Sequence, residues 1–262
     1  MKERVNGTAD SGAGKGRRRL PGLLLRDGFT QHPFDAEFAV RTSGLVAGRH
    51  LETGQHNDRY NTAYYAVPPS VLRALIGRWR RSPQIAPLDQ YTFIDLGAGM
   101  GRAVMVASEY RFRRVIGVEL NPTLARMARR NLTVWRKAAR AKAPMSIRCA
   151  DAANFTFPSG PCVVFLFNPF GAPVLRRVLA SVAQAFAARA GQLDLLYVNH
   201  EHEDVLKRQG GFSNLFSGQV MRSRADAIAD HSILANQPDG EYSAANYEDC
   251  SIWRWVGSAS KS

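Results

Sequence analysis

Three glycines at alternating positions form the strongest chemical signal in the sequence. Gly97, Gly99 and Gly101 follow a short apolar run, and residues 102–110 then show the apolar pattern of a helix. Glycine lets a backbone turn tightly and approach a ligand closely, and a helix start offers unpaired N–H groups. The dinucleotide fingerprint G-x-G-x-x-G needs glycine where this chain has Arg102. The spacing therefore predicts a ligand site of another kind.

Polar side chains end four successive strands that the sequence predicts. They are Asp95, Glu119, Asp151 and Asn168, the last opening the run Asn168-Pro169-Phe170. Ligands of open α/β sheets bind outside the carboxyl ends of the strands. A carboxylate at Glu119 can accept hydrogen bonds from both ribose hydroxyls. Asp151 can either accept a proton from an adenine amine or cap a turn.

Apolar runs alternate with helical patterns from residue 91 onward. We expect strands at 91–96, 115–120, 146–150, 163–167 and 193–198, and helices at 102–110, 122–142, 173–189 and 201–209. Strand-like stretches follow at 212–220, 232–235 and 250–256. This alternation predicts an α/β fold with a Rossmann-like doubly wound sheet, mostly parallel with an antiparallel C-terminal edge and helices on both faces.

The remaining sequence divides into two parts. Residues 1–19 are rich in Gly, Ser and Arg and predict a disordered basic tail. Residues 20–88 form an N-terminal lead-in with a helical cap, because Pro68-Pro69 precede apolar residues at helical spacing, ended by Pro83. The α/β domain then covers residues 89–262.

The net charge of +13 is concentrated in the middle of the chain. Residues 61–148 hold 16 Lys/Arg against 4 Asp/Glu, a net charge of +12. Such a field favours an anionic partner such as nucleic acid or an acidic protein; the alternative is a solvated arginine-rich surface. We expect Cys149, Cys162 and Cys250 to be reduced and buried. No metal-ligand set is expected from their spacing or from that of the histidines, and no apolar run reaches the length of a membrane span.

Two runs resemble the first two motifs of class I S-adenosylmethionine (SAM)-dependent methyltransferases. They are Phe93–Arg102 and Val115–Pro122, and Cys149–Ala152 resembles the third motif. The resemblance implies SAM as the cofactor and makes residues 89–262 a SAM-binding domain. It places Gly97 and Gly99 under the methionine moiety, Asp95 at its amino end, Glu119 at the ribose and Asp151 at the adenine. The full set of residues implied to bind the cofactor is Asp95, Gly97, Ala98, Gly99, Gly101, Glu119, Leu120, Asp151, Ala152 and Asn168.

The run after the fourth strand resembles the Asn/Asp-Pro-Pro-aromatic motif of amino-group methyltransferases. Here Phe170 replaces the second proline and Gly171 the aromatic residue. The resemblance implies Asn168, Pro169 and Phe170 as catalytic residues, with Asn168 contacting the target nitrogen; the alternative is that Asn168 caps a turn. Residues 60–69 are similar to the lead-in of lysine methyltransferases related to the Dot1-like group, and their tyrosines Tyr60, Tyr64 and Tyr65 could cover the cofactor or pack on the sheet.

The sequence thus predicts an enzyme that transfers a methyl group from SAM to an acceptor. We expect the acceptor to be a nitrogen of a protein or other macromolecule. The alternatives are a small-molecule acceptor, or a non-catalytic nucleic-acid-binding module on the same fold. The location expected for a chain with these thiols is cytoplasmic, with no membrane partner.

Overall fold

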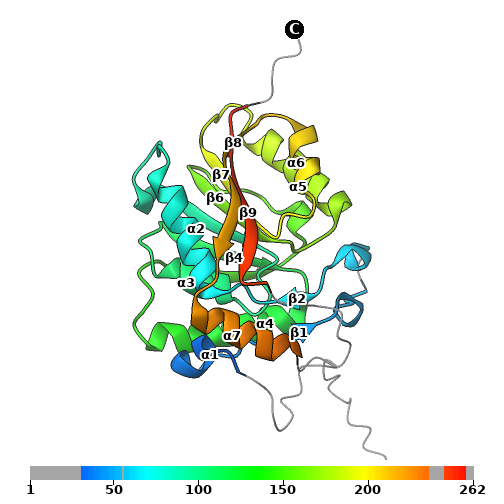
Figure 1. Ribbon diagram of the computed structural model, residues 1–262. Helices are drawn as coiled ribbons and strands as arrows, with labels where there is room; N and C mark the ends of the chain where they lie inside the picture. Colours follow the sequence, from blue (N-terminus) through cyan, green and yellow to red (C-terminus); the bar gives the residue numbers. More distant parts are fainter. Residues whose placement is uncertain (1–30, 55, 236–244, 258–262) are drawn as a thin grey trace, which may run out of the picture.

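A seven-stranded sheet forms the centre of the protein, in the order β5-β4-β3-β6-β7-β9-β8 (Figure 1). In this computed structural model, residues 31–54, 56–235 and 245–257 are described, so the expected tail at 1–19 lies outside the described residues. The strands are β3 (Thr92–Leu96), β4 (Arg114–Glu119), β5 (Met145–Cys149), β6 (Cys162–Phe167), β7 (Leu193–Val198), β8 (Phe212–Met221) and β9 (Tyr247–Trp255).

The five strands β3 to β7 run parallel, and β9 pairs antiparallel with both β7 and β8. The chain leaves β3 toward β4 and β5, then returns to β6 on the other side of β3. This reversal places a topological switch point between the carboxyl ends of β3 and β6, where open α/β sheets bind ligands. The predicted parallel sheet with an antiparallel C-terminal edge is confirmed.

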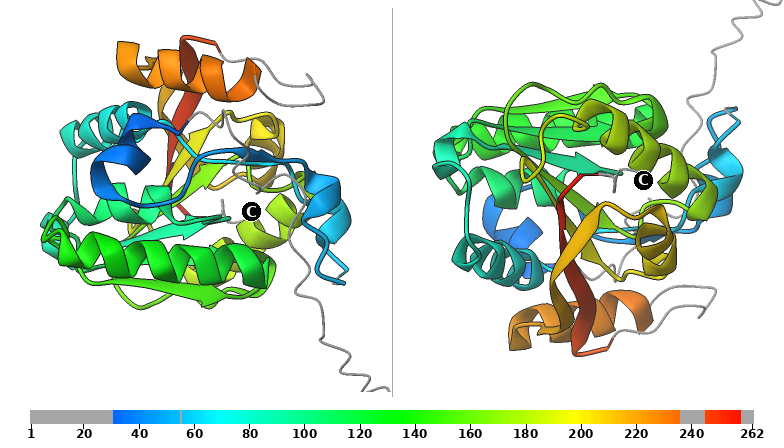
Figure 2. Two further views of the ribbon diagram at one scale, coloured as in Figure 1. Left: turned by 90° about the horizontal axis from the view of Figure 1, so that it is seen from below. Right: turned by 90° about the horizontal axis from the view of Figure 1, so that it is seen from above.

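Helices cover both faces of the sheet (Figure 2). Apolar side chains of α2, α3 and α4 belong to one core cluster, and those of α5 and α6 to a second cluster on the opposite face. The helices are α2 (Pro69–Arg81), α3 (Arg102–Ser108), α4 (Pro122–Lys137), α5 (Ala172–Ala185) and α6 (Glu203–Gln209), with single 3-10 turns at η3 (Leu88–Gln90) and η4 (Ala152–Asn154). No helix of the described ranges is long and apolar enough to cross a membrane.

The N-terminal lead-in and the helix α7 (Arg224–Ala235) lie together at one end of the molecule (Figure 1). The described lead-in contains α1 (Pro33–Phe38), β1 (Leu45–Val46), η1 (Gly48–His50), η2 (Asp58–Tyr60) and β2 (Tyr64–Tyr65). β1 and β2 pair antiparallel. A further bridge joins Asn61 to Phe170, so the lead-in crosses the carboxyl ends of the strands.

The prediction of a strand at 232–235 is wrong, because these residues end helix α7. Buried residues on α7 recur at helical spacing as Asp226, Ala229, Asp230 and Ile233. The hydroxyl of Ser223 accepts a hydrogen bond from the Asp226 N–H at 3.1 Å, which caps the first turn. Four apolar-biased residues alone are too few to separate a helical period from a strand period.

The expectation that all three cysteines are buried is wrong for Cys149, which is exposed. It ends the edge strand β5, whose outer side has no neighbouring strand among the described residues. Cys162 and Cys250 lie on interior strands and are buried, as expected. The helix expected at 122–142 ends at Lys137, and Ala139 then takes a left-handed φ of 54°.

Candidate active site

The glycine loop turns from β3 into α3 at the switch point. All three glycines have positive φ, at 88°, 52° and 88° for Gly97, Gly99 and Gly101. The N–H groups of Gly97 and Ala98 both donate to the Val118 carbonyl at 2.9 Å, which ties the loop to the end of β4. A Cβ on Gly97 would lie 2.3 Å from the Pro169 side chain. The loop therefore requires glycine for its backbone conformation and for its close packing.

Two carboxylates lie buried beside this loop. Glu119 accepts hydrogen bonds from the Gly99 N–H at 2.7 Å and from the Asn121 N–H at 2.8 Å. Asp95 is 3% exposed, and burial together with the nearby Glu119 charge raises its pKa from 3.8 to about 8. Burial also raises the pKa of Glu119. A cationic ligand would compensate this concentration of buried negative charge.

Asp151 follows β5 and caps a turn, which is one of the two roles that the sequence left open. One oxygen caps η4 by accepting from the Ala153 N–H at 2.9 Å, and the other accepts from the Asn57 amide at 2.6 Å. The Arg177 guanidinium lies 4.0 Å away. Each carboxylate oxygen has a second lone pair, so the cap and a ligand contact are compatible.

One cavity joins the glycine loop to the lead-in. Of the residues implied to bind the cofactor, Gly101 and Asn168 do not line it. The other eight residues of that set line the cavity: Asp95, Gly97, Ala98, Gly99, Glu119, Leu120, Asp151 and Ala152. The wall also contains Leu51, Asn57, Asn61, Asn121 and Leu124, which the sequence motifs did not predict. Asn121 could have been found from Asn121-Pro122, a helix-start signal; the lead-in residues carry no comparable signal.

The lead-in lies directly over the loop. The Tyr64 ring is so close to Gly99 that a Cβ there would lie 2.2 Å from its Cε2 atom. Tyr64 is buried, and its hydroxyl donates to the Thr42 carbonyl at 2.7 Å. Tyr65 donates to the Asp230 carboxylate on α7. These contacts fix the tyrosines between the lead-in, the loop and α7.

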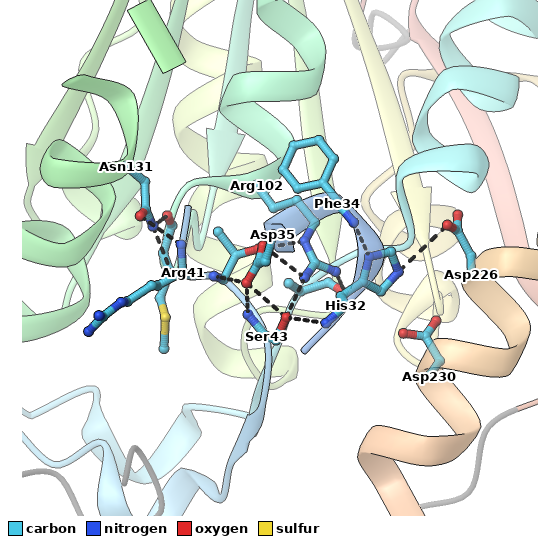
Figure 3. Close-up of polar contacts among 12 residues, drawn as sticks. His32, Phe34, Asp35, Arg41, Ser43, Arg102, Asn131, Asp226 and Asp230 are labelled. Atoms are coloured by element: carbon cyan, nitrogen blue, oxygen red, sulfur yellow. Dashed lines mark hydrogen bonds and ion pairs between the residues drawn. The ribbon is translucent and has the colours of Figure 1, made fainter. Parts of the chain in front are cut away.

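Arg102 is the first residue of α3, and its side chain binds the lead-in (Figure 3). Its side chain is 2% exposed, donates to the Thr42 hydroxyl at 2.6 Å and lies 3.6 Å from the Asp35 carboxylate. Asp35 in turn accepts hydrogen bonds from the N–H and hydroxyl groups of Thr42 and Ser43. His32 lies 3.6 Å from Asp226 on α7, so the network continues across the molecule.

A second cavity adjoins the first on the side of β7 and β9. The two share wall residues Asn61, Thr62, Ala63, Tyr65 and Phe167. The second is also lined by the polar and charged residues Asn168, Asn199, Glu201, Arg222, Glu248 and Asp249. Arg222 pairs with Glu248 at 2.5 Å and with Asp230 at 3.2 Å. The cavity wall therefore holds three acidic residues, Glu201, Glu248 and Asp249, against one arginine.

Asn168 lies at the junction of β6 and the second cavity. Its φ is 38°, and its backbone carbonyl accepts a hydrogen bond from the Thr62 hydroxyl at 2.5 Å. The carboxamide Oδ1 is buried and has no hydrogen-bond partner. Pro169 packs on the glycine loop, and Phe170 bridges to the lead-in. Among the described residues, no group of three or more His, Cys, Asp or Glu side chains is placed to hold a metal ion.

The residues of the first cavity fit SAM by their chemistry. SAM carries a positive sulfonium and an ammonium group, a ribose and an adenine. The cavity has the carboxylates of Asp95, Glu119 and Asp151 on its walls, together with a backbone loop that has room only for glycine. The cation of Arg102 is already engaged by Asp35 and the hydroxyl of Thr42.

Comparison with protein families matches residues 83–143 to the family described as "Histone methylation protein DOT1". This segment runs from the turn before β3 through α4 and holds the glycine loop and Glu119. No curated protein sequence matches the chain.

Solved structures with a similar fold include several methyltransferases. Magnesium protoporphyrin IX methyltransferase from Synechocystis PCC 6803, with bound SAM, is 15% identical and aligns over 72% of this chain and 77% of its own, with a TM-score of 0.43. Ribosomal protein L11 methylase from Lactobacillus delbrueckii subsp. bulgaricus is 13% identical over 69% and 76%, with a TM-score of 0.40. Precorrin-6y C5,15-methyltransferase from Geobacter metallireducens GS-15 is 15% identical over 71% and 87%, with a TM-score of 0.45.

The family match covers both methyltransferase motifs, and the sheet brings those motifs together at its switch point. The family match and the chemistry of this site support a class I SAM-dependent methyltransferase, which is an enzyme with SAM as its cofactor.

The raised pKa of Asp95 predicts that cofactor affinity depends on pH. At neutral pH the free protein holds Asp95 mostly protonated, because its pKa is about 8. A cationic ligand stabilises the ionised form, so binding releases a proton and affinity rises with pH by up to about tenfold per unit until the pKa is passed. Calorimetry in buffers of different ionisation enthalpy measures this proton release.

The matched variant for this prediction is Asp95→Asn, which cannot ionise. It should bind SAM more weakly and without the proton release. The folded state binds the Asp95 proton more tightly than the unfolded state does, so this group's contribution to stability falls as pH rises from 3.8 to about 8. Asp95→Asn should remove that fall. If Asp95→Asn released the same number of protons on binding SAM, the proton would come from a group other than Asp95.

Proposed function

We propose that the protein transfers the methyl group of SAM to a nitrogen atom of a protein or other macromolecule. The observation that carries the proposal is the pair of adjoining cavities. One is lined by the glycine loop and its carboxylates, and the other by acidic groups and by the free oxygen of Asn168. We assign SAM to the first cavity and the acceptor to the second.

The proposed cofactor contacts follow the chemistry of each wall. The buried pair Asp95 and Glu119 would face the positive methionine end and the ribose hydroxyls, while Asp151 would accept from the adenine amine. The loop residues Gly97 to Gly101 would shape the cavity floor. Bound there, SAM supplies an electrophilic methyl group on a good leaving group, so the protein has to position the acceptor, exclude water and manage one proton.

The acidic lining of the second cavity supports a basic nitrogen as the acceptor. Glu201 and Asp249 are exposed at its rim, where they can attract a protonated amine and take up its proton before transfer. Asn168 also lines this cavity, and its Oδ1 atom is buried without a hydrogen-bond partner. A buried oxygen without a donor is energetically unfavourable, and an acceptor N–H group would supply that donor.

The test is methyl transfer from radiolabelled SAM to fractionated cell lysate. The proposal predicts label in the macromolecular fraction that survives mild alkali, since N-methyl groups are stable there whereas methyl esters of carboxylates are not. Protease and nuclease digestion then separate protein from nucleic acid acceptors. Alkali-labile label, or label confined to small molecules, would contradict the nitrogen or the macromolecule respectively.

Two variants separate the acceptor role from the cofactor role. Asn168→Gly removes the carboxamide and tolerates the positive φ, and Glu201→Gln removes a rim charge. Both should lower transfer while SAM affinity stays within about twofold, because neither residue lines the first cavity. Glu37→Gln, an exposed carboxylate on α1, is the control. A parallel loss of SAM affinity would remove Asn168 from the acceptor side.

A further inference from the structure

The outer face of α4 and the adjacent edge of β5 form a strongly basic surface, here called the α4 face. Residues 120–150 contain eight Lys/Arg and no Asp/Glu. All eight side chains are exposed: Arg126, Arg129, Arg130, Arg136, Lys137, Arg140, Lys142 and Arg148. Figure 2 shows α4 along the outside of the molecule, beside the sheet edge. This face therefore carries eight of the 16 Lys/Arg that residues 61–148 contain.

The helical spacing aligns these cations. The buried side of α4 holds Leu124, Ala128 and Leu132 among others, while Arg126, Arg130 and Lys137 fall on the opposite side of the helix. A residue rises about 1.5 Å along a helix, so the charges from Arg126 to Lys137 span roughly 16 Å. That length matches several successive phosphates of a duplex strand, which lie about 3.4 Å apart along the axis.

Two arginines of the α4 face are held in place by the edge strand. Arg129 donates to the Ile147 carbonyl at 3.3 Å, and Arg136 donates to the Met145 carbonyl at 2.6 Å. The guanidinium of Arg148 stacks on Phe155 at 5.5 Å. Only Arg140 has an acidic partner in the described structure, Glu109 at 3.5 Å. Like charges three or four residues apart destabilise a helix, and an anionic ligand relieves that repulsion.

The character of the surface selects the kind of anion. The exposed large hydrophobic side chains of the described chain all lie outside residues 102–150. A helix that lies in a membrane interface buries an apolar face there, and the centre of a protein interface is apolar. The rings in contact with these arginines are buried, as for Phe155 and Trp135, or partly buried beneath Arg140, as for Phe38, so no exposed ring is available to stack on unpaired bases. The exposed cations of the α4 face are therefore suited to contacts with phosphate groups.

We infer that the α4 face binds the phosphate backbone of a nucleic acid duplex, independently of the base sequence. The first turn of α4 reaches the cofactor cavity through Asn121 and Leu124, so a duplex on this face would lie beside the entrance of the active site. The inference does not depend on which acceptor is methylated, because it concerns binding alone.

The test uses fluorescence anisotropy with labelled 20-base-pair DNA and RNA duplexes at several salt concentrations. The triple variant Arg126→Glu/Arg130→Glu/Lys137→Glu alters three exposed side chains with no recorded partner among the described residues. It should weaken binding at least about tenfold and reduce the slope of log affinity against log salt by about 3, roughly one unit for each lost phosphate contact.

The matched control is Arg176→Glu/Arg208→Glu/Arg224→Glu, which changes the net charge equally on α5, α6 and α7. It should leave the slope unchanged, and circular dichroism melting should show both triple variants folded. Stronger binding of DNA or of RNA supports the inference in either case and names the duplex. Equal losses in the two variants, no binding by the unaltered protein at low salt, or equal competition by polyglutamate would overturn it.

Discussion

Replacing Gly99 with arginine is expected to abolish SAM binding, and replacing it with alanine to weaken binding by about tenfold or more. The residue has a φ of 52°, and an added Cβ would lie 2.2 Å from the Tyr64 ring. A left-handed backbone costs a non-glycine residue about 1–2 kcal/mol, and the clash forces the loop or Tyr64 out of place. The longer arginine side chain also enters the cavity. Calorimetric titration with SAM measures both effects.

Gly160→Ala is the control for this experiment. Gly160 has a φ of 84°, and its nearest foreign atom would lie 3.8 Å from an added Cβ. The substitution therefore imposes a similar backbone penalty at the opposite end of β6, without a clash and without contact to either cavity. It should lower stability slightly and leave SAM affinity unchanged. If both alanine variants lost affinity equally, the effect of Gly99 would be one of stability rather than of the site.

Replacing Arg102 with glutamine is expected to destabilise the protein by about 3–5 kcal/mol, because it leaves the buried Asp35 carboxylate without its cation. Both side chains are at most 2% exposed. Arg102 also donates to the Thr42 hydroxyl at 2.6 Å, so its loss loosens the lead-in from the glycine loop. Urea unfolding followed by fluorescence and circular dichroism measures the change in free energy.

A double-mutant cycle identifies the cause of that loss. Asp35→Asn/Arg102→Gln should be less destabilised than the sum of the two single variants, because no unpaired charge remains. Arg208→Gln, which breaks an exposed pair with Asp204 on α6, should change stability by less than about 1 kcal/mol. Additive effects of Asp35 and Arg102 would show that the charge pair contributes nothing of its own.

The sequence predicted the parts of the site that depend on local chemistry. Gly97 and Gly99 are recognisable because a tight turn with positive φ needs glycine, and Glu119 because it ends an apolar strand. The mostly parallel sheet followed from the alternation of strand and helix patterns, which continues without interruption from β3 to β7. For these elements, the information lies within a few residues of the feature that it predicts.

The parts that the sequence did not predict depend on distant contacts. Arg102 served only to exclude a dinucleotide site, since its partners Asp35 and Thr42 lie about 60 residues earlier, in the lead-in. The assignment of Asn168 to the second cavity rather than the first depends on how the lead-in crosses β6. Helix α7 was missed because two of its five buried residues are the aspartates Asp226 and Asp230, which contact the lead-in and interrupt the apolar pattern of the helix.

The contacts between the lead-in and α7 also affect how the protein matures during synthesis. The Ser70 N–H donates to Asp226 at 2.8 Å across 156 residues of sequence, and Tyr65 reaches Asp230 across 165. The lead-in leaves the ribosome early, whereas its partners are among the later residues to be translated. Contacts of such separation form slowly and late. The nascent chain can therefore assemble its parallel sheet co-translationally, but the lead-in, which forms part of the wall of the cofactor cavity, is held by α7 only after α7 has emerged.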